Sequence, residues 1–256
     1  MLAYKNSVHL SECLASLANQ SEQCDVVVST STPNEYIYSI AKKYNFPVIE
    51  NPVSEGIGAD WNFALALAAG RRITLCHQDD VYHPDYANRV MEFFRQSPQL
   101  AMVFTNHHET LEDGRKADGL NVFIKRGLTR WAFGGQQVVQ GRDVRRRLLG
   151  FGNPVSCPSV ALNMSELDGF RFSEKLQINL DWDAWGRIAE AGGHLGYIQT
   201  PLVSHRVHDG SETSAGLRDS RREQEDVLMF ERYWPKPWVR FIMLLYRRSY
   251  ASNNRR

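Results

Sequence analysis

The chain reads Ile73-Thr74-Leu75-Cys76-His77-Gln78-Asp79-Asp80 at the place that decides its fold. The apolar and β-branched half, residues 73–76, predicts a buried strand. The strand runs into Asp79 and Asp80, two adjacent carboxylates that repel each other and are costly to bury. Ligands bind at such strand ends in open α/β sheets. A divalent cation would relieve the repulsion, so the stretch predicts a Mg²⁺ or Mn²⁺ site. The alternative is a solvated turn in which Asp80 caps the next helix.

Composition indicates an ordinary globular protein. The chain has 256 residues, 43% of them hydrophobic and 23% charged, which is enough for one large domain or two small ones. The net charge of +1 gives no argument for binding nucleic acid, and we expect no such partner. Cys13 and Cys76 lie in apolar patterns and are expected to be buried thiols, which suits a reducing cytosol. No signal peptide is visible, and no apolar run approaches the length of a membrane span.

Strands and helices alternate along the first part of the chain. Strands are predicted at residues 25–29, 47–50, 73–76 and 101–105, and helices at residues 8–18, 35–44, 61–69 and 85–96. Asp60 is expected to cap the third helix. This alternation means parallel βαβ units and an α/β sheet.

The rhythm changes after Asn106. Residues 107–141 are polar, glycine-rich and irregular, and are predicted to form a long functional loop. A basic helix (residues 141–149), a strand (158–163), a helix (181–191) and a last short strand from Tyr197 follow.

Five segments carry a resemblance to one family. They are residues 3–6 with 10–14, 51–69, 77–80, 180–185 and 205–208. In their order and spacing they make residues 1–210 resemble the family 2 inverting glycosyltransferases. Residues 77–80 occupy the place of that family's DXD-type motif. Residues 180–185 resemble the motif that supplies the catalytic base, and residues 205–208 resemble the segment that closes over the diphosphate.

The resemblance implies a GT-A fold, which is a Rossmann-like, mixed and mostly parallel sheet flanked by helices. We expect this domain over residues 1–215 and a basic amphipathic helical tail over residues 216–256. Only Met1-Leu2-Ala3 precedes Tyr4, so the first strand is expected to be truncated, or the natural start to lie upstream.

The resemblance also implies a metal-dependent inverting reaction. A nucleotide-diphospho-sugar would donate its sugar to a saccharide or lipid-linked acceptor, as in the synthesis of cell-surface polysaccharides. Mn²⁺ or Mg²⁺ would be held by Asp79, Asp80 and His208. The catalytic base would be Asp181. The donor would contact Ala3, Tyr4, Ser29, Ser31, Asn62 and Asp79.

Four positions depart from the family pattern. His77 replaces the first aspartate of the DXD-type motif, and Ser29 replaces the aspartate that often reads uracil. Trp61 stands near a position that is often basic, and Leu180 replaces a glutamate. These departures leave two alternatives: a catalytically inactive subunit that binds sugar nucleotides, or a metal-dependent phosphoesterase or nucleotidyltransferase that uses the aspartate pair.

Two aspartates compete for the role of base. Asp183 precedes Arg187 by one helical turn, which predicts a surface ion pair. Asp181 stands at the predicted helix start, where it is either an N-cap or the base. The resemblance favours Asp181 as the base. For the imidazole that contacts metal or phosphate, we favour His208 over His205.

The C-terminal segment is apolar, aromatic and basic. Residues 238–246 are too few to span a bilayer but suit an interfacial helix on anionic lipid. We therefore expect a cytoplasmic protein with peripheral membrane contact through residues 236–248, at the inner face of the membrane. The alternative is a helix packed on the catalytic domain or on a partner subunit.

Overall fold

The computed structural model describes residues 1–52, 55–68, 72–207 and 221–253. Three parallel strands form the first sheet, in the order β1 (Leu2–Ala3), β2 (Val28–Thr30) and β3 (Val48–Glu50). The backbone N–H of Leu2 donates to the carbonyl of Cys76 over 2.8 Å, and Leu2 bridges to His77. The end of the strand that the sequence singled out therefore continues this sheet into the second one.

The second sheet is mixed. Its strand order is β4-β8-β6-β9-β5, and β7 pairs with β9. β6 and β9 are parallel, whereas β8 is antiparallel to both of its neighbours. The strands are β4 (Arg72–Thr74), β5 (Val81–Tyr82), β6 (Leu100–Thr110), β7 (Val138–Gln140), β8 (Val160–Asn163) and β9 (His194–Arg206).

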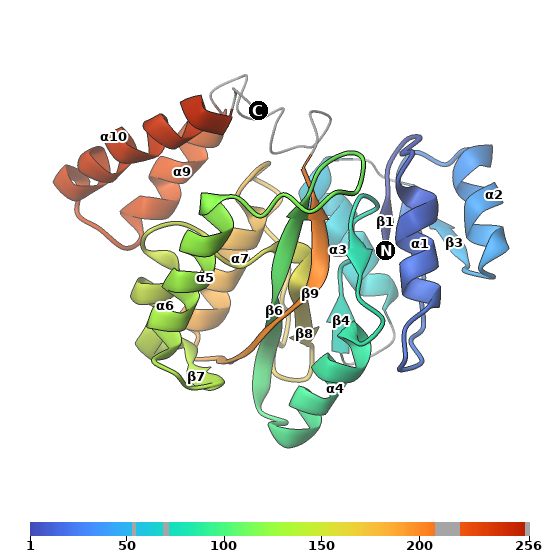
Figure 1. Ribbon diagram of the computed structural model, residues 1–256, viewed down its shortest axis with the longest axis horizontal. Coiled ribbons are helices and arrows are strands. Elements are labelled where there is room, and N and C mark those ends of the chain that lie inside the picture. Colours follow the sequence, from blue (N-terminus) through green and yellow to red (C-terminus); the bar gives the residue numbers. More distant parts are fainter. Residues whose placement is uncertain (53–54, 69–71, 208–220, 254–256) are drawn as a thin grey trace.

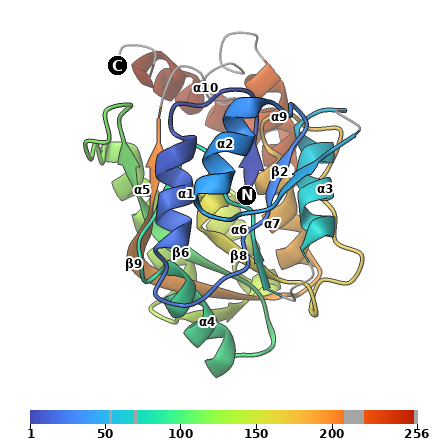
Figure 2. The same ribbon diagram turned by 90° about the vertical axis from the view of Figure 1, so that its right-hand side faces the viewer.

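Helices cover both faces of the sheets (Figure 1). They are α1 (Leu10–Ala18), α2 (Glu35–Lys43), α3 (Ile57–Leu67), α4 (Tyr86–Gln96), α5 (Leu120–Phe133), α6 (Gly141–Leu149), α7 (Leu180–Glu190), α9 (Arg221–Glu231) and α10 (Lys236–Asn253). Figure 2 shows α1 and α2 side by side at one face. A short 3₁₀ helix, Cys157–Ser159, leads into β8. The α/β class expected from the alternating pattern is confirmed.

The hydrophobic core has two parts because side chains alternate across the strands. On β8, Val160 and Leu162 belong to the cluster under α5, α6, α7, α9 and α10, whereas Ala161 belongs to the cluster under α1, α2 and α4. On β6, Phe104 belongs to the first of these clusters and Val103 to the second. The sheet thus lies between two helical layers, and its strand ends are open for a site.

The expected long loop over residues 107–141 is wrong. β6 continues to Thr110 beside β9, and α5 occupies fourteen of these residues. Phe133 on α5 packs against Phe104 and Tyr197. The helical pattern was hidden because Leu120 and Phe123 on the outer face are exposed, while Thr129 on the inner face is buried. Hydrophobic periodicity therefore did not mark the buried face.

The start of α3 also differs from the expectation. The helix begins at Ile57, with Gly56 as its N-cap, so Asp60 lies inside the first turn and caps nothing. The carboxylate of Asp60 instead faces the ends of β2 and β3, where it accepts hydrogen bonds from Ser31 and Asn51.

The tail packs on the domain, as the alternative reading of residues 236–248 held. Met229, Phe230, Tyr233, Val239 and Met243 are buried in the cluster that includes α7. Figure 1 shows α9 and α10 beside α7 at one end of the molecule. Among the described residues, no helix is both long and apolar enough to cross a membrane.

Candidate functional site

The ends of the first strands form one side of the site. Ala3 is buried, and the backbone of Tyr4 is held in both directions by the side chain of Gln78. The Tyr4 N–H donates to Gln78 Oε1 over 2.8 Å, and Gln78 Nε2 donates to the Tyr4 carbonyl over 3.0 Å. The Tyr4 ring is 44% exposed, which leaves a flat aromatic surface at the strand end. Sequence reasoning missed Gln78, which joins the opening motif to the aspartate pair.

A carboxylate lies beside the predicted donor serines. Ser29 is buried within β2, and Ser31 Oγ donates to Asp60 Oδ2 over 2.8 Å. Asn51 Nδ2 donates to Asp60 Oδ1 over 2.7 Å. Asp60 from α3 therefore supplies a negative charge close to the place where Ser29 lacks one. The sequence suggested only a helix cap for it, so its position was missed.

The side chain of Asn62 is hydrogen-bonded within the fold. Its amide nitrogen donates to the Phe172 carbonyl over 3.0 Å and to Glu174 Oε1 over 2.9 Å. Its amide oxygen accepts the Phe172 N–H over 2.7 Å. The buried amide thus ties α3 to residues 172–174. We expected a contact with the donor phosphate, but these three partners use the amide's hydrogen-bonding groups within the fold.

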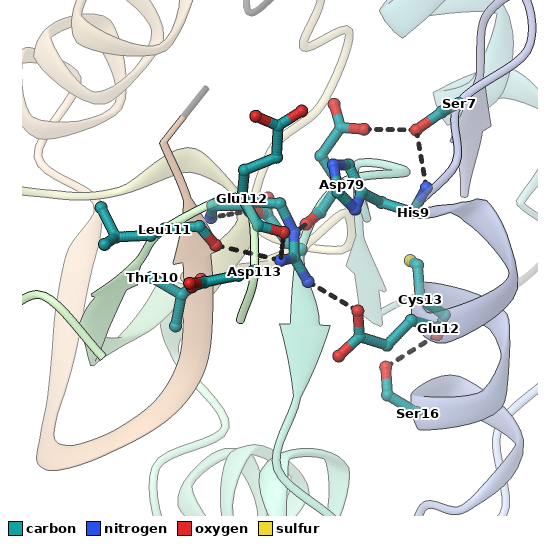
Figure 3. A network of polar contacts seen from close by, with 12 residues as sticks. Ser7, His9, Glu12, Cys13, Ser16, Asp79, Thr110, Leu111, Glu112 and Asp113 are labelled. Atoms are coloured by element: carbon teal, nitrogen blue, oxygen red, sulfur yellow. Dashed lines mark hydrogen bonds and ion pairs between the residues drawn. The ribbon is translucent and has the colours of Figure 1, made fainter. Parts of the chain in front are cut away.

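Asp79 lies at the surface between α1 and the strand ends. Ser7 Oγ donates to Asp79 Oδ1 over 2.7 Å, and the Asp79 carbonyl accepts from Arg206 Nε over 3.1 Å. Arg206 is 3% exposed and also donates to Glu12 and to the Leu111 and Glu112 carbonyls. Figure 3 shows these partners converging from α1, from the turn that holds Asp79 and from the chain after β6. Sequence reasoning missed Ser7, Glu12 and the fastening role of Arg206.

Asp80 is 1% exposed, so the alternative of a solvated capping residue is wrong. Its Oδ1 accepts from His205 Nδ1 over 2.9 Å and from the Arg206 N–H over 3.0 Å. Burial by itself would raise the pKa of this carboxyl, but the charge and hydrogen bond of His205 outweigh it and the pKa is lowered. Asp80 is therefore held ionised at the floor of the site.

The residues around Asp80 fit a hard divalent cation. Within the described part of the chain, Asp80 Oδ2 has no hydrogen-bond partner, and the buried Nε2 of His77 has none either. Burial lowers the pKa of His77, so its ring is neutral and can offer a lone pair. Mg²⁺ is commonly held by one or two carboxylates together with substrate phosphates. No group of three or more His, Cys, Asp or Glu side chains suited to a metal occurs among the described residues, and His208 lies outside them.

Asp181 lies on the other side of the site as the second residue of α7. Its Oδ1 accepts the Trp182 N–H over 2.7 Å, and its Oδ2 accepts from Asn153 Nδ2 over 2.8 Å. Burial raises the pKa of the Asp181 carboxyl to about 6. Because the helix begins at Leu180, Asp181 is not its cap. A carboxyl that ionises close to neutral pH is suited to accept a proton from a substrate.

The predicted ion pair between Asp183 and Arg187 is confirmed, but its place at the surface is wrong, because Asp183 is buried. Asp183 is 6% exposed and lies between two arginines. Arg187 Nε contacts its Oδ2 over 2.8 Å, and Arg232 Nη1 contacts its Oδ1 over 2.8 Å. The Arg187 pair lies within α7, and the Arg232 pair joins α7 to the tail. Asp183 therefore has a charged partner at each oxygen, and Asp181, whose hydrogen-bond partners are neutral, stays the predicted base.

The two carboxylates share a neighbourhood. Burial raises the pKa of the Cys157 thiol well above its ordinary value, and the charges of Asp181 and Asp80 add to this rise. Cys157 is the first residue of the short 3₁₀ helix before β8. The predicted metal ligand Asp80 and the predicted base Asp181 are therefore both near enough to act on one buried thiol.

Comparison with known proteins identifies the family. The sequence profile described as "Glycosyl transferase family 2" matches residues 1–167. The chain belongs to this family. The enzyme class predicted from the motifs, a glycosyltransferase, is the class that this family's description states. Among curated proteins, none matches the chain in sequence.

Solved structures place this family 2 chain in the GT-A fold. TarS 1–349 of S. aureus, in complex with UDP-GlcNAc, is 17% identical, with a TM-score of 0.64 over 84% of this chain and 59% of that one. The mannosyltransferase PcManGT of Pyrobaculum calidifontis, in complex with GDP-Man and Mn²⁺, is 15% identical, with a TM-score of 0.61 over 94% and 66%.

A third neighbour is glucosyl-3-phosphoglycerate synthase of Mycobacterium tuberculosis, in complex with phosphoglyceric acid. It is 14% identical, with a TM-score of 0.54 over 91% of this chain and 79% of that one. The family 2 chain spans only 38% of the longer TarS structure. At these identities the likenesses show the fold, and they confirm the GT-A expectation.

Proposed function

We propose that the protein is a metal-dependent inverting glycosyltransferase. It transfers a sugar from a nucleotide-diphospho-sugar to a hydroxyl of a saccharide or a lipid-linked saccharide, in the synthesis of cell-surface polysaccharide. The observation that carries the proposal is the carboxyl of Asp181, whose pKa is raised to about 6 and whose charge acts on the same buried thiol, Cys157, as that of the ionised Asp80. Membership of family 2 and the GT-A fold support it.

The nucleotide of the donor lies across the ends of β1 and β2 in this proposal. The exposed ring of Tyr4 offers a stacking surface, and Ala3, Ser29 and Ser31 line the strand ends. Asp60 provides the carboxylate that Ser29 does not, and it can accept from an N–H of the base. Two structural neighbours are in complex with UDP-GlcNAc and with GDP-Man, donors that differ in their base, so the test below includes donors with several bases.

The donor diphosphate lies near the aspartate pair. Asp80, with Asp79 and His208, would hold Mn²⁺ or Mg²⁺, and the ion would neutralise charge on the departing nucleoside diphosphate. The neighbour PcManGT in complex with Mn²⁺ supports this assignment. Asp80 would contribute the negative ligand through Oδ2, because its Oδ1 is already anchored to His205 and Arg206.

Asp181 acts on the acceptor. Its carboxylate removes the proton from the acceptor hydroxyl as the oxygen attacks the anomeric carbon from the face opposite the diphosphate, which inverts the configuration. Asn153 and the Trp182 N–H each hold one of its oxygens, so the carboxylate has a fixed direction. A positioned base of this kind contributes about 10²–10⁴-fold in rate.

A screen of nucleotide sugars tests the function. The protein is incubated with UDP-, GDP-, CMP- and dTDP-linked sugars, Mn²⁺ and simple glycoside acceptors, and the released nucleotide is identified by chromatography. Nucleoside diphosphate released together with glycosylated acceptor supports the proposal. Release of phosphate or pyrophosphate would indicate a phosphoesterase or nucleotidyltransferase instead. Donor binding without any turnover would indicate an inactive binding subunit.

We also propose a cytoplasmic location with contact to the membrane surface. The four cysteines, Cys13, Cys24, Cys76 and Cys157, are free thiols. The outer face of α10 exposes Trp238, Phe241, Leu244 and Leu245. Exposed Lys236 and Arg240 on the same helix suit anionic lipid. Flotation with vesicles that contain anionic lipid tests this contact, and Phe241→Glu should abolish flotation if α10 is responsible.

A further inference from the structure

The tail contacts the start of the helix that carries Asp181. The buried carboxylate of Glu225 on α9 accepts three backbone N–H groups: Gln177 over 2.8 Å, Ile178 over 2.9 Å and Asn179 over 2.8 Å. Asn179 Nδ2 also donates to Asp226 Oδ1 over 2.7 Å. A carboxylate placed at the positive end of a helix satisfies N–H groups that have no partner within the helix. The chain that leads into α7 is thus fixed by α9.

The next residues of α7 also contact the tail. The Trp182 ring meets the Phe230 ring edge-on, with centroids 5.0 Å apart. Asp183 Oδ1 pairs with Arg232 Nη1 over 2.8 Å. Asp181 therefore lies in a run of residues, 179–183, that α9 and the chain after it hold on both sides.

A second segment held by the tail reaches Asp181 directly. Trp234 Nε1 donates to the Gly150 carbonyl over 2.5 Å, and the Tyr246 hydroxyl occupies the place that a Cβ at Gly152 would need. The next residue, Asn153, donates through Nδ2 to Asp181 Oδ2 over 2.8 Å. Residues 150–153 therefore transmit the position of the tail to the carboxylate.

We propose that α9 and α10 position the catalytic base, with Glu225 fixing the start of α7 and Trp234 fixing the segment whose Asn153 orients Asp181. Glu225, Trp234 and Asn153 are positioning residues in this view, and the inference rests on the proposed role of Asp181. The tail and the domain of residues 1–207 then act as one catalytic unit.

The pH dependence of transfer distinguishes this role from a merely structural one. The charged and titratable groups that act on Asp181 are Lys125 on α5, Arg222 on α9 and the Cys157 thiol before β8. Asn153 adds a hydrogen bond that favours the ionised carboxylate. Removing that hydrogen bond should raise the pH at which the base becomes active.

The first test measures kcat against pH for Asn153→Ala. The acid limb of the profile should move up by about one to two pH units, because a hydrogen bond to a charged group is of that size. Asn153→Asp should move the limb further, since a second carboxyl would face Asp181. Donor affinity, measured by calorimetry with the nucleoside diphosphate and Mn²⁺, should remain within about twofold, because these contacts lie at the other side of the site.

The second test compares two glutamates on one helix. Glu225→Gln removes the charge that three N–H groups share, and kcat should fall by about ten- to a hundredfold from displacement of the base. Glu231→Gln changes an exposed residue of the same helix and should leave kcat and the pH profile unchanged. Trp234→Phe keeps an aromatic ring but loses the donor to Gly150, and its acid limb should shift in the same direction as that of Asn153→Ala.

The outcomes separate the inference from the function. Superposable pH profiles for Asn153→Ala and the unmodified protein would overturn the positioning role, even if Asp181→Asn is inactive. Equal kcat values for Glu225→Gln and Glu231→Gln would overturn the proposed role of α9 in positioning Asp181. If Glu225→Gln does not fold, the Asn153 and Trp234 variants still decide. An unmodified protein that transfers no sugar from any donor would instead reject the proposed function.

Discussion

At the residue scale, two departures from the family pattern meet in space. Trp61 replaces a residue that is often basic, and His77 replaces the first aspartate of the DXD-type motif; their rings lie 5.2 Å apart. A neutral aromatic contact thus occupies the place where opposite charges would be expected. The buried Nε2 of His77 keeps its hydrogen-bonding capacity free.

Asp181→Asn should lower transfer by about two to four orders of magnitude while donor binding survives, because the base acts only on the acceptor. The folded state holds the pKa of Asp181 at about 6, above its ordinary 3.8, so ionisation of this group costs stability as the pH rises through this window. Above pH 6 the variant should therefore be as stable as the unmodified protein or more stable, by up to about 3 kcal/mol. Activity assays and denaturant unfolding at pH 4 and pH 7.5 measure both effects.

Asp183→Asn is the control variant. The structure raises the loss of stability that we expect from it. A surface pair would contribute only about 0.3–0.5 kcal/mol, but Asp183 is buried between two arginines, and breaking a buried pair costs about 3–5 kcal/mol. The variant should be destabilised and yet retain transfer at low temperature. An Asp183 variant that is stable but inactive would reverse the assignment of the base.

Asp60→Asn should weaken binding of the donor nucleotide by about tenfold, since a charge-assisted hydrogen bond to the base becomes a neutral one. The fold should hold, because asparagine can still accept from Ser31 or Asn51. Calorimetric titration with the nucleoside alone, without diphosphate or metal, isolates the effect on the base. Unchanged affinity in that titration would assign Asp60 a purely structural place.

At the element scale, the end of β9 joins parts that are distant in sequence. Arg206 links it to α1 through Glu12, to the turn after β4 through Asp79 and to the chain after β6 through two carbonyls. The positions of Asp79 and Asp80 therefore depend on a residue far along the chain. Arg206, whose N–H donates to Asp80, is 126 positions away from it. Local sequence contains no sign of such a link.

Arg206→Met should lower the free energy of unfolding by at least about 2 kcal/mol, because the carbonyl groups of Asp79, Leu111 and Glu112 lose the donors of a buried guanidinium. Glu12→Gln should cost less than about 1 kcal/mol, since the Glu12 side chain is 56% exposed. Chemical denaturation of both variants compares them directly. Equal losses would show that the Arg206–Glu12 pair, rather than the carbonyl contacts, carries the stabilisation.

At the scale of the whole molecule, the candidate metal ligands follow the strand that joins the two sheets, and the tail packs on the helix that carries the candidate base. The cation is expected to couple these parts, since its ligands follow β4 and β9 while the base lies on α7. EDTA should abolish transfer, and Mn²⁺ or Mg²⁺ should restore it. Asp80→Asn should weaken Mn²⁺ binding measured by electron paramagnetic resonance. Full transfer in chelator would reject the metal-dependent mechanism.

The sequence by itself determined the fold class, the family and the order of the motifs. Buried strands and the helices between them are local patterns, and the aspartate pair at the end of Ile73–Cys76 is a local signal as well. Asp181 and Asp80 could therefore be singled out as candidates before any coordinates. Element boundaries were less secure, as α5 shows, because an exposed apolar face and a buried threonine disguise its periodicity.

Only the tertiary structure decided which polar groups meet. Several of these contacts join residues that are far apart in the sequence. They are the contacts of Ser31 with Asp60, of Asn62 with Phe172, of Asp183 with Arg232 and of Asn153 with Asp181. The same side-chain types could have been solvated, and spacing does not distinguish the two cases. Burial and partner geometry set the pKa of Asp181 and the charge of Asp80, and both depend on packing across the sheets rather than on neighbours in sequence.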